Sequence, residues 1–321
     1  MNELGPLVDA FAEWDAWNGG CPMGSTANFL GVLTDLEFLE RHHPSNTKAD
    51  KEGENAPVRT PQVSDGEPFF EFAAIYKAIH AAQGQFVMVE LGGGYAARSV
   101  DAYQALQRMN PMPAQLVVVE AEPTHFEWVK RHMKANHIDP LAHWLINAAV
   151  SIDSNPLLFL RGEGLFYNGI VSAGEINTLV EDIIGRGSSD QVLKNLMTGG
   201  RCGMYIPYNS AAGEDFFDYE FVSAMPLTDI LAPLSQVDLI DIDIQGAENI
   251  VILPAMAMLN QRVKRIHIGT HSDDIHKGLW ELFFEHEWIC DFDYGPEGQH
   301  DTPWGQFETM DGILHFCNPH L

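Results

Sequence analysis

The sequence has a shortage of basic residues, and this shortage excludes two large classes of partner. Its 18 lysines and arginines stand against 45 aspartates and glutamates, which gives a formal charge of −27. Because an electric field of this sign repels nucleic acids and anionic membrane surfaces, we predict that the protein binds neither. The same charge favours ligands that are uncharged or cationic.

Cysteines are also few, and long apolar runs are missing. The four cysteines (Cys21, Cys202, Cys290 and Cys317) are far apart in the chain and form no C-x-x-C pair. We therefore expect reduced thiols in a cytoplasmic protein rather than a disulfide framework. No apolar run reaches the roughly 18 residues that a membrane span requires. The acidic start MNELGPLVDA does not have the basic and apolar regions of a signal peptide.

A chain of 321 residues with 45% hydrophobic content is long enough for one large α/β domain with additional segments. From residue 86, short apolar runs alternate with amphipathic stretches, which predicts a parallel, doubly wound sheet with helices on both faces. The expected strands are 86–91, 116–120, 144–150, 237–243, 263–269, 287–293 and 312–317. The expected helices are 96–109, 123–136, 246–259 and 274–286.

Two segments lie outside this alternation. We interpret residues 1–67 as a helical cap with helices over 4–17 and 28–41, followed by a polar linker or lid. The apolar faces of these helices could seal an active site or join two subunits. The main domain then covers 68–321, starting with a helix over 68–82, and contains an insertion at 161–225. Candidate residues for an acceptor pocket in this insertion are Tyr167, Tyr205 and Tyr208.

The stretch from Phe86 to Ser99, FVMVELGGGYAARS, reads as a buried strand, a tight turn and the start of a helix. Bare glycine backbone permits close approach of a ligand, and a helix N-terminus presents N–H groups to it. Gly92, Gly94 and Ala97 fit the loose dinucleotide pattern G-x-G-x-x-A, with Gly93 between the first two, and Glu120 ends the next strand as a ribose-binding acid does. An NAD-dependent oxidoreductase is therefore one hypothesis.

Glu90, two residues before the first glycine, favours a different ligand. Its carboxylate would repel a pyrophosphate but suits the methionyl ammonium of S-adenosylmethionine, which carries a sulfonium and no phosphate. Glu120 can then accept both ribose hydroxyl groups. Asn147 and Ala148 close the third strand, where small residues would leave room for adenine and the Asn147 amide could bind it.

Polar residues at the ends of two later strands are the candidates for catalysis. Asp241 and Asp243 share one face of the strand 237–243, with Asp243 nearer the crevice, and an acid in a strand built largely from apolar residues is costly unless it has a partner or a task. Glu248 lies in the first turn of the next helix, where a favourable interaction with the helix dipole is an equally good explanation. His271 follows the fifth strand, and histidine is the usual general base at neutral pH.

Two catalytic devices remain open at this point. His271, oriented by Asp243, could remove the proton of a hydroxyl group. A divalent metal ion held by Asp243 and by Asp273 or Asp274 could acidify that hydroxyl group instead. We also expect Asp273 or Asp274 to cap the helix that follows.

Several motifs together resemble the FkbM-like family of S-adenosylmethionine-dependent methyltransferases. The matching stretches are VELGGGYAARSV, the acid in VVVEAEP, NAAVS, PLTDIL, DLIDIDIQGAE, IGTHS and DGILHF. The resemblance implies a Rossmann-like class I methyltransferase sheet of seven strands with an antiparallel last strand. It also implies O-methylation, often of sugars or secondary metabolites. Asp241 stands where the family usually has lysine.

The leading hypothesis is a cytoplasmic, S-adenosylmethionine-dependent O-methyltransferase acting on a hydroxyl group of a small molecule. The alternatives are the NAD-dependent oxidoreductase and a non-catalytic S-adenosylmethionine-binding scaffold.

Overall fold

The structure is a computed structural model of the whole chain. It describes residues 17–42, 56–59, 66–162, 169–170, 202–205, 216–302 and 305–321. The helix expected over 4–17 and two of the three candidate tyrosines, Tyr167 and Tyr208, lie outside these ranges. The third, Tyr205, is described only as part of a strand.

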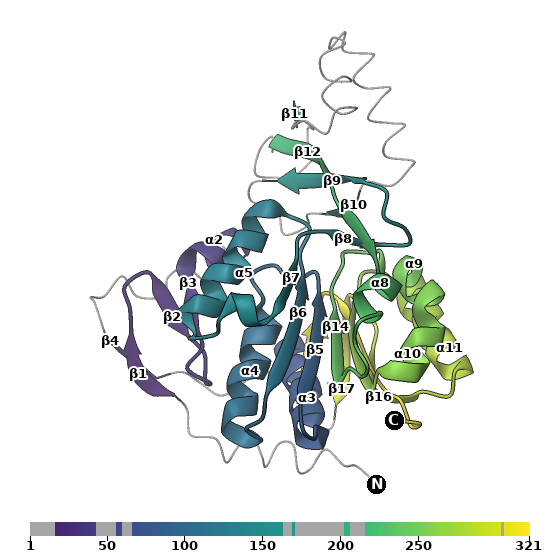
Figure 1. Cartoon of the computed structure of the whole chain (residues 1–321), viewed down its shortest axis with the longest axis horizontal. Helices are drawn as coiled ribbons and strands as arrows, with labels where there is room; N and C mark the ends of the chain where they lie inside the picture. The colour runs from purple at the N-terminus through teal and green to yellow at the C-terminus, as the bar shows by residue number, and fades with distance from the viewer. Residues whose placement is uncertain are drawn as a thin grey trace.

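A seven-stranded sheet forms the centre of the molecule (Figure 1). Its strands are β5 (Phe86–Leu91), β6 (Ala114–Val119), β7 (Trp144–Ile146), β14 (Leu239–Ile242), β15 (Arg265–Thr270), β16 (Ile289–Tyr294) and β19 (Gly312–Cys317). Their order across the sheet is β16-β19-β15-β14-β5-β6-β7. The strands from β7 to β15 pair in parallel, and β19 is antiparallel to both β15 and β16. The predicted sheet with an antiparallel last strand is therefore confirmed.

Helices cover both faces of this sheet, because its strands are apolar on both sides. The cluster on one face includes residues of α3 (Glu67–Ala81), α4 (Ala97–Met109) and α5 (Pro123–Ala135). The cluster on the other face includes residues of α8 (Leu227–Leu231), α9 (Glu248–Ile252), α10 (Met256–Arg262) and α11 (Asp273–Glu285). The single helix expected over 246–259 is wrong, because a 3-10 turn, η2 (Leu253–Ala255), separates α9 from α10. Pro254 in this turn has no N–H to continue an α-helix.

The helix expected over 28–41 is also wrong in its first half. Residues 33–35 form strand β3 (Leu33–Asp35), which pairs with β2 (Ser25–Ala27), and α2 (Leu36–His42) begins only afterwards. Gly31, with a φ of 75°, turns the chain ahead of β3 and interrupts the helical spacing. Within the expected linker, β4 (Ala56–Arg59) pairs with β1 (Asn18–Cys21).

Additional strands lie outside the central sheet. Figure 1 shows β9 (Leu157–Gly162), β10 (Gly169–Ile170), β11 (Cys202–Tyr205) and β12 (Phe216–Val222) above it, where they form a second sheet. The strand predicted at 144–150 is split into β7 and β8 (Ala149–Ser151), and β8 pairs with β13 (Ala224–Pro226). A hairpin of β17 (Gly298–Thr302) and β18 (Gly305–Thr309), which sequence patterns did not predict, precedes β19.

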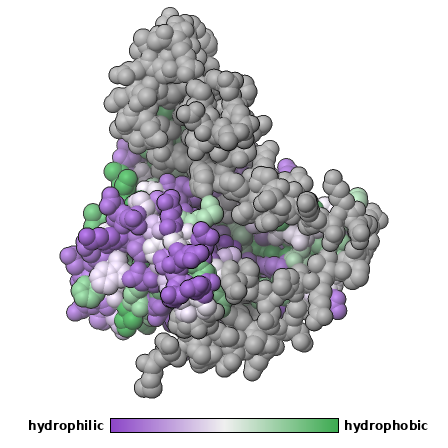
Figure 2. All heavy atoms as spheres, turned by 180° about the vertical axis from the view of Figure 1, so that it is seen from behind, coloured by the Kyte–Doolittle hydropathy of each residue, from purple (hydrophilic) through white to green (hydrophobic). Residues whose placement is uncertain are grey.

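The coloured surface in Figure 2 is mainly hydrophilic, with separate hydrophobic spots. Among the described residues, the search for a helix both long and apolar enough to cross a bilayer found none.

Candidate functional site

The glycine turn after β5 lies directly against the end of β14. Gly92 has a φ of 82°, and a Cβ atom built on it would overlap the carbonyl oxygen of Asp243. A Cβ on Gly93 would lie 2.5 Å from a methyl carbon of Val118. Glycine is therefore required at both positions, since the turn is pressed between its two neighbouring strands. Gly94 has a positive φ of 54° but open space around it.

A cavity of about 520 Å³, which we call the glycine-turn pocket, opens where β5, β14, β15 and β19 meet. Six carboxylate side chains and one guanidinium line it: Glu67, Glu71, Glu90, Asp241, Asp243, Asp311 and Arg98. Arg98 forms an ion pair with Glu71 across α3 and α4. The pocket therefore has an excess of acidic groups, which favours a ligand with positive charge.

The side chain of Glu90, a residue of β5, reaches the start of helix α4. Its two carboxylate oxygens accept hydrogen bonds from the backbone N–H groups of Arg98 (3.2 Å) and Ser99 (2.9 Å). Burial raises the pKa of Glu90, while these hydrogen bonds to Ser99 and the charge of Arg98 lower it. The sequence-based expectation of free N–H groups at this helix start is therefore wrong for these two amides. Glu90 fills the place in which a phosphate would bind.

Glu120 and Asn147 also hold the turn together. The carboxylate of Glu120 accepts hydrogen bonds from the N–H groups of Gly94 and Glu122, both at 2.7 Å. Burial raises the pKa of Glu120 to about 8 against the effect of the Gly94 bond. The Asn147 amide donates to the carbonyl oxygens of Glu120 (2.8 Å) and Ala121 (3.2 Å). Ala148 is buried beside them. Each oxygen of Glu120 keeps capacity for a second hydrogen bond, so binding of a ribose by Glu120 stays a prediction.

Asp241 stands between two other titratable groups on neighbouring strands. It pairs in register with Glu90 on β5 and with His267 on β15, and all three line the glycine-turn pocket. Burial raises the pKa of Asp241 well above its ordinary value, Glu90 adds to this effect, and Arg98 opposes it. Burial also lowers the pKa of His267 to about 3. The sequence placed Asp241 on the same strand face as Asp243 and marked it as a departure from the family pattern, but it did not indicate His267.

The variant Asp241→Asn is expected to be more stable relative to the natural protein at pH 8 than it is at pH 4. A carboxyl group with a raised pKa in the folded state contributes stability below its unfolded pKa, near 3.8, and loses that contribution as the pH rises. The variant should therefore gain stability over the natural protein between the two pH values, because only the natural protein loses the contribution of the buried carboxyl group as the pH rises. Urea unfolding at both pH values measures this difference.

Asp238→Asn is the matched control on the same strand segment, because Asp238 pairs with Lys264 (2.7 Å) and accepts a bond from the Val87 N–H (2.8 Å). Loss of the Asp238 charge in this variant breaks the ion pair with Lys264 and should destabilise the protein at pH 8. Equal pH dependence in Asp241→Asn and the natural protein would contradict the prediction.

The structure brings His271, Asp243 and Glu248 together, as the sequence predicted, and adds Asp311. Nδ1 of His271 lies 2.9 Å from Glu248 Oε1. Nε2 lies 3.3 Å from Asp243 Oδ1 and 3.7 Å from Asp311 Oδ1, within ion-pair distance of both. Glu248 therefore orients the imidazole ring through Nδ1, while Nε2 faces the carboxylates of Asp243 and Asp311.

Glu248 is fully buried and fixes the turn between β14 and α9. Its Oε1 atom accepts hydrogen bonds from the N–H groups of Ile244 (3.3 Å) and Gly246 (3.0 Å) as well as contacting His271. Burial lowers the pKa of His271, but hydrogen bonds and charge from Asp243 and Glu248 outweigh it and raise that pKa to about 10. In this arrangement His271 is in its imidazolium form, with both ring nitrogens protonated, at neutral pH.

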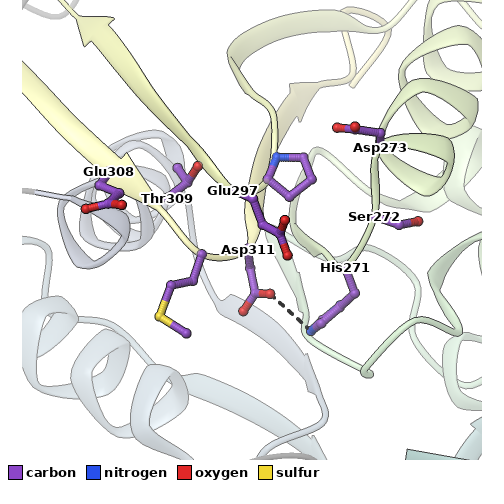
Figure 3. Close-up of a pocket in the computed structure, with 9 residues that line it drawn as sticks. His271, Ser272, Asp273, Glu297, Glu308, Thr309 and Asp311 are labelled. Carbon is purple, nitrogen blue, oxygen red and sulfur yellow. Dashed lines mark ion pairs between the residues drawn. The ribbon is translucent and has the colours of Figure 1, made fainter.

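A second cavity of about 660 Å³, the hairpin pocket, lies beside His271 and the base of the β17–β18 hairpin (Figure 3). Its lining residues are His271, Ser272, Asp273, Pro296, Glu297, Glu308, Thr309, Met310 and Asp311. Figure 3 shows the side chains of Asp311 and His271 pointing toward one another. The glycine-turn pocket shares Met310 and Asp311 with this cavity. The two pockets therefore adjoin at the Met310–Asp311 turn.

Glu67, the first residue of α3, holds this turn in place. Its Oε1 atom accepts hydrogen bonds from the N–H groups of Met310 (2.7 Å) and Asp311 (3.1 Å). Sequence patterns did not indicate Glu67, because it acts through backbone groups more than 200 residues away. Asp311 was part of the DGILHF stretch that resembles the family, but no role in the site was assigned to it.

The expected cap at α11 is corrected. Ser272, and not Asp273 or Asp274, caps the helix by accepting a hydrogen bond from the Ile275 N–H (3.3 Å). Within the described ranges, no group of three or more His, Cys, Asp or Glu side chains is arranged to hold a metal ion. Metal dependence thus stays an open expectation from the sequence.

Comparisons with known proteins give distant likenesses. No protein-family model matches the chain, and no curated protein matches it. Solved structures that resemble it include a precorrin-6y C5,15-methyltransferase from Geobacter metallireducens, with 11% identity and a TM-score of 0.38 over 81% of this chain and 92% of that chain. A methyltransferase FkbM from Methylobacillus flagellatus has 11% identity and a TM-score of 0.40 over 74% of this chain and 45% of that one. An O-methyltransferase from Bacillus cereus, solved in complex with SAH, has 12% identity and a TM-score of 0.36 over 88% and 90%.

The strand order and the antiparallel β19 decide the architecture. The fold is that of the class I methyltransferases. Activity must be argued from the site, because a fold does not determine function.

Proposed function

We propose that the protein is an S-adenosylmethionine-dependent O-methyltransferase that acts on a hydroxyl group of a small molecule. One observation favours S-adenosylmethionine over NAD as the ligand. The carboxylate of Glu90 accepts hydrogen bonds from the backbone N–H groups of Arg98 and Ser99 at the start of α4. A dinucleotide needs such amides for its pyrophosphate and would meet a carboxylate there instead.

The charges of the glycine-turn pocket agree with this donor. S-adenosylmethionine carries an ammonium, a sulfonium and a carboxylate group, so it is cationic overall. Six carboxylates and Arg98 line the pocket. Glu90 and Asp241 on adjacent strands would face the ammonium group, and Arg98 is the basic residue that could meet the carboxylate. Glu120 and Asn147 would lie beside the ribose and the adenine.

Bound S-adenosylmethionine supplies an activated methyl group, so the chain must align the acceptor, exclude water and remove a proton. In this proposal Glu248 holds the proton on Nδ1 of His271, and Nε2 takes the proton of the acceptor hydroxyl group. The acceptor would lie in the hairpin pocket, with its hydroxyl group between His271 and the shared Met310–Asp311 turn. Alignment of this kind corresponds to effective molarities on the order of 10⁵–10⁸ M.

The cofactor assignment is tested by titrating the pure protein with S-adenosylhomocysteine and with NAD in calorimetry. Saturable binding of S-adenosylhomocysteine with weaker or absent NAD binding is the expected result. Tighter binding of NAD would reject the proposal in favour of an oxidoreductase.

The proposed acceptor is an uncharged or cationic hydroxyl compound, such as a sugar or a secondary metabolite. Asp273, Glu297, Glu308 and Asp311 line the hairpin pocket, and His271 is the basic side chain among them. Turnover should therefore be faster with an amino sugar than with the corresponding sugar acid. Binding of S-adenosylhomocysteine without turnover of any hydroxylated acceptor would indicate a donor-binding scaffold.

The pH dependence of turnover should identify the protonation state that His271 needs. Because Nε2 must be free of its proton to act as a base and the pKa of His271 is raised to about 10, kcat/KM should increase with pH up to about 10. Glu248→Gln removes one of the carboxylates that raise this pKa, so its rising limb should lie at lower pH. Initial rates from pH 6 to pH 11 measure the rising limb of the natural protein and that of the Glu248→Gln variant. A rate that falls as the pH rises toward 10 would mean that the protonated imidazole is the active form.

A further inference from the structure

A third cavity lies at the opposite edge of the central sheet, away from both pockets described above. Its volume is about 480 Å³, and it is formed where β15 begins, β19 ends and the loop after α3 passes. We call it the basal pocket, and the residues relevant to its chemistry are Gln83, Gln236, Lys264, Arg265, Cys317 and Asn318.

No acidic side chain lines the basal pocket among the described residues. This is unusual for a chain with 45 acids and 18 bases. Lys264 is held at its rim by Asp238, with 2.7 Å between Nζ and Oδ1. The exposed side chains of Gln83 and Gln236 add amide donors and acceptors at the opening.

Arg265 is the distinctive residue of this pocket. Its Nε atom is buried without a hydrogen-bond partner in the described structure. Arg98 and Arg131 form ion pairs with carboxylates, and Arg108 and Arg262 donate to backbone carbonyl groups. Among arginines with described side chains, Arg265 is thus the one with no recorded partner. A buried guanidinium donor without a partner is costly, and an anion would satisfy it.

We propose that the basal pocket binds a small oxoanion, a phosphate or carboxylate group, through the guanidinium of Arg265 with support from Lys264. The planar fork of a guanidinium matches the geometry of both anions and can bind them in a bidentate manner. Lys264 also lines the pocket, where its ammonium group is shared with Asp238 and can donate a further hydrogen bond to the anion. This site is independent of the proposed methyl transfer, since none of its residues lines the glycine-turn pocket or the hairpin pocket.

The full chain is titrated with inorganic phosphate in one arm of the test and with acetate in the other. Both titrations are made at constant ionic strength, in a buffer that contains neither phosphate nor acetate. The probe is the Arg265 Nε–H resonance in protein labelled with ¹⁵N-arginine, and calorimetry gives the affinity. A saturable shift of this resonance is expected, and the arm with the lower dissociation constant identifies the anion. Arg265→Gln should weaken the affinity at least tenfold.

Lys277→Gln is the matched control, because Lys277 is an exposed lysine of α11 whose neighbour Glu281 lies 3.9 Å away. It removes the same unit charge outside the pocket and should change the affinity less than twofold. Absence of a saturable shift in the natural protein in both arms would overturn the proposal, and this result does not depend on the folding of a variant. Equal weakening by both substitutions would overturn it as well, because it would show attraction by overall charge.

Discussion

Replacing Gly92 by alanine is expected to abolish binding of S-adenosylhomocysteine and to destabilise the protein strongly. The added Cβ atom would overlap the carbonyl oxygen of Asp243, and the backbone at Gly92 has a φ of 82°. The positive φ costs roughly 1–2 kcal/mol for a residue with a side chain. The overlap adds to this cost because neither strand end can move freely within a packed sheet. Relief of the clash would push β14 away from β5 and open the floor of the glycine-turn pocket.

Gly94→Ala separates backbone strain from this clash. Gly94 also has a positive φ, of 54°, but its Cβ would meet no atom within 4 Å. It should therefore lose only about 1–2 kcal/mol of unfolding free energy and should retain binding. Urea unfolding and calorimetry with S-adenosylhomocysteine measure both effects. If Gly92→Ala bound the ligand as well as Gly94→Ala does, the close contact between the two strand ends would have no part in ligand binding.

Replacing His271 by alanine should lower turnover by about 10²–10⁴, the usual contribution of a general base. The affinity for S-adenosylhomocysteine should change little, because His271 lines the hairpin pocket and not the glycine-turn pocket. Its Nε2 atom lies 3.3 Å from Asp243 Oδ1 and 3.7 Å from Asp311 Oδ1. An acceptor hydroxyl group that reaches Nε2 would therefore replace its contact with Asp243.

His276→Gln is the matched control for loss of a buried histidine. His276 contacts Thr270 (2.8 Å) and Asp293 (2.9 Å) and lines neither pocket. Its replacement should reduce stability but preserve turnover per folded molecule. Steady-state rates and calorimetry on both variants make the comparison. Turnover retained in His271→Ala would remove the proposed base, and equal loss in both variants would indicate a structural effect.

The sequence predicted the central sheet well because each buried strand is a short apolar run between turn residues. The run from Phe86 to Leu91 and the closing run from Gly312 to Cys317 have the predicted bounds. The N-terminal segment was predicted poorly, because the apolar spacing over 28–41 fits a helix but Gly31 turns the chain there. Local periodicity cannot indicate a hairpin such as β17–β18, whose strands are half-exposed and polar.

The candidate catalytic residues could be predicted because the carboxyl ends of parallel strands meet at one edge of a sheet. This places Asp243 and His271 close together without any knowledge of their side-chain contacts. The sequence could not show that Glu248 turns back from its helix to contact His271. It also could not place Asp311, since that residue reaches the site only through the antiparallel pairing of β19 with β15.

The bond from Glu67 to the Met310–Asp311 turn also affects where the chain can be cut. The sequence suggested a domain boundary between residues 67 and 68, and a fragment that begins at Pro68 would retain all seven strands of the central sheet. Such a fragment would nevertheless lack the carboxylate that holds the Met310–Asp311 turn, which lines both pockets. Truncation at this boundary would thus remove a part of the site that belongs, by its position in the chain, to the discarded segment.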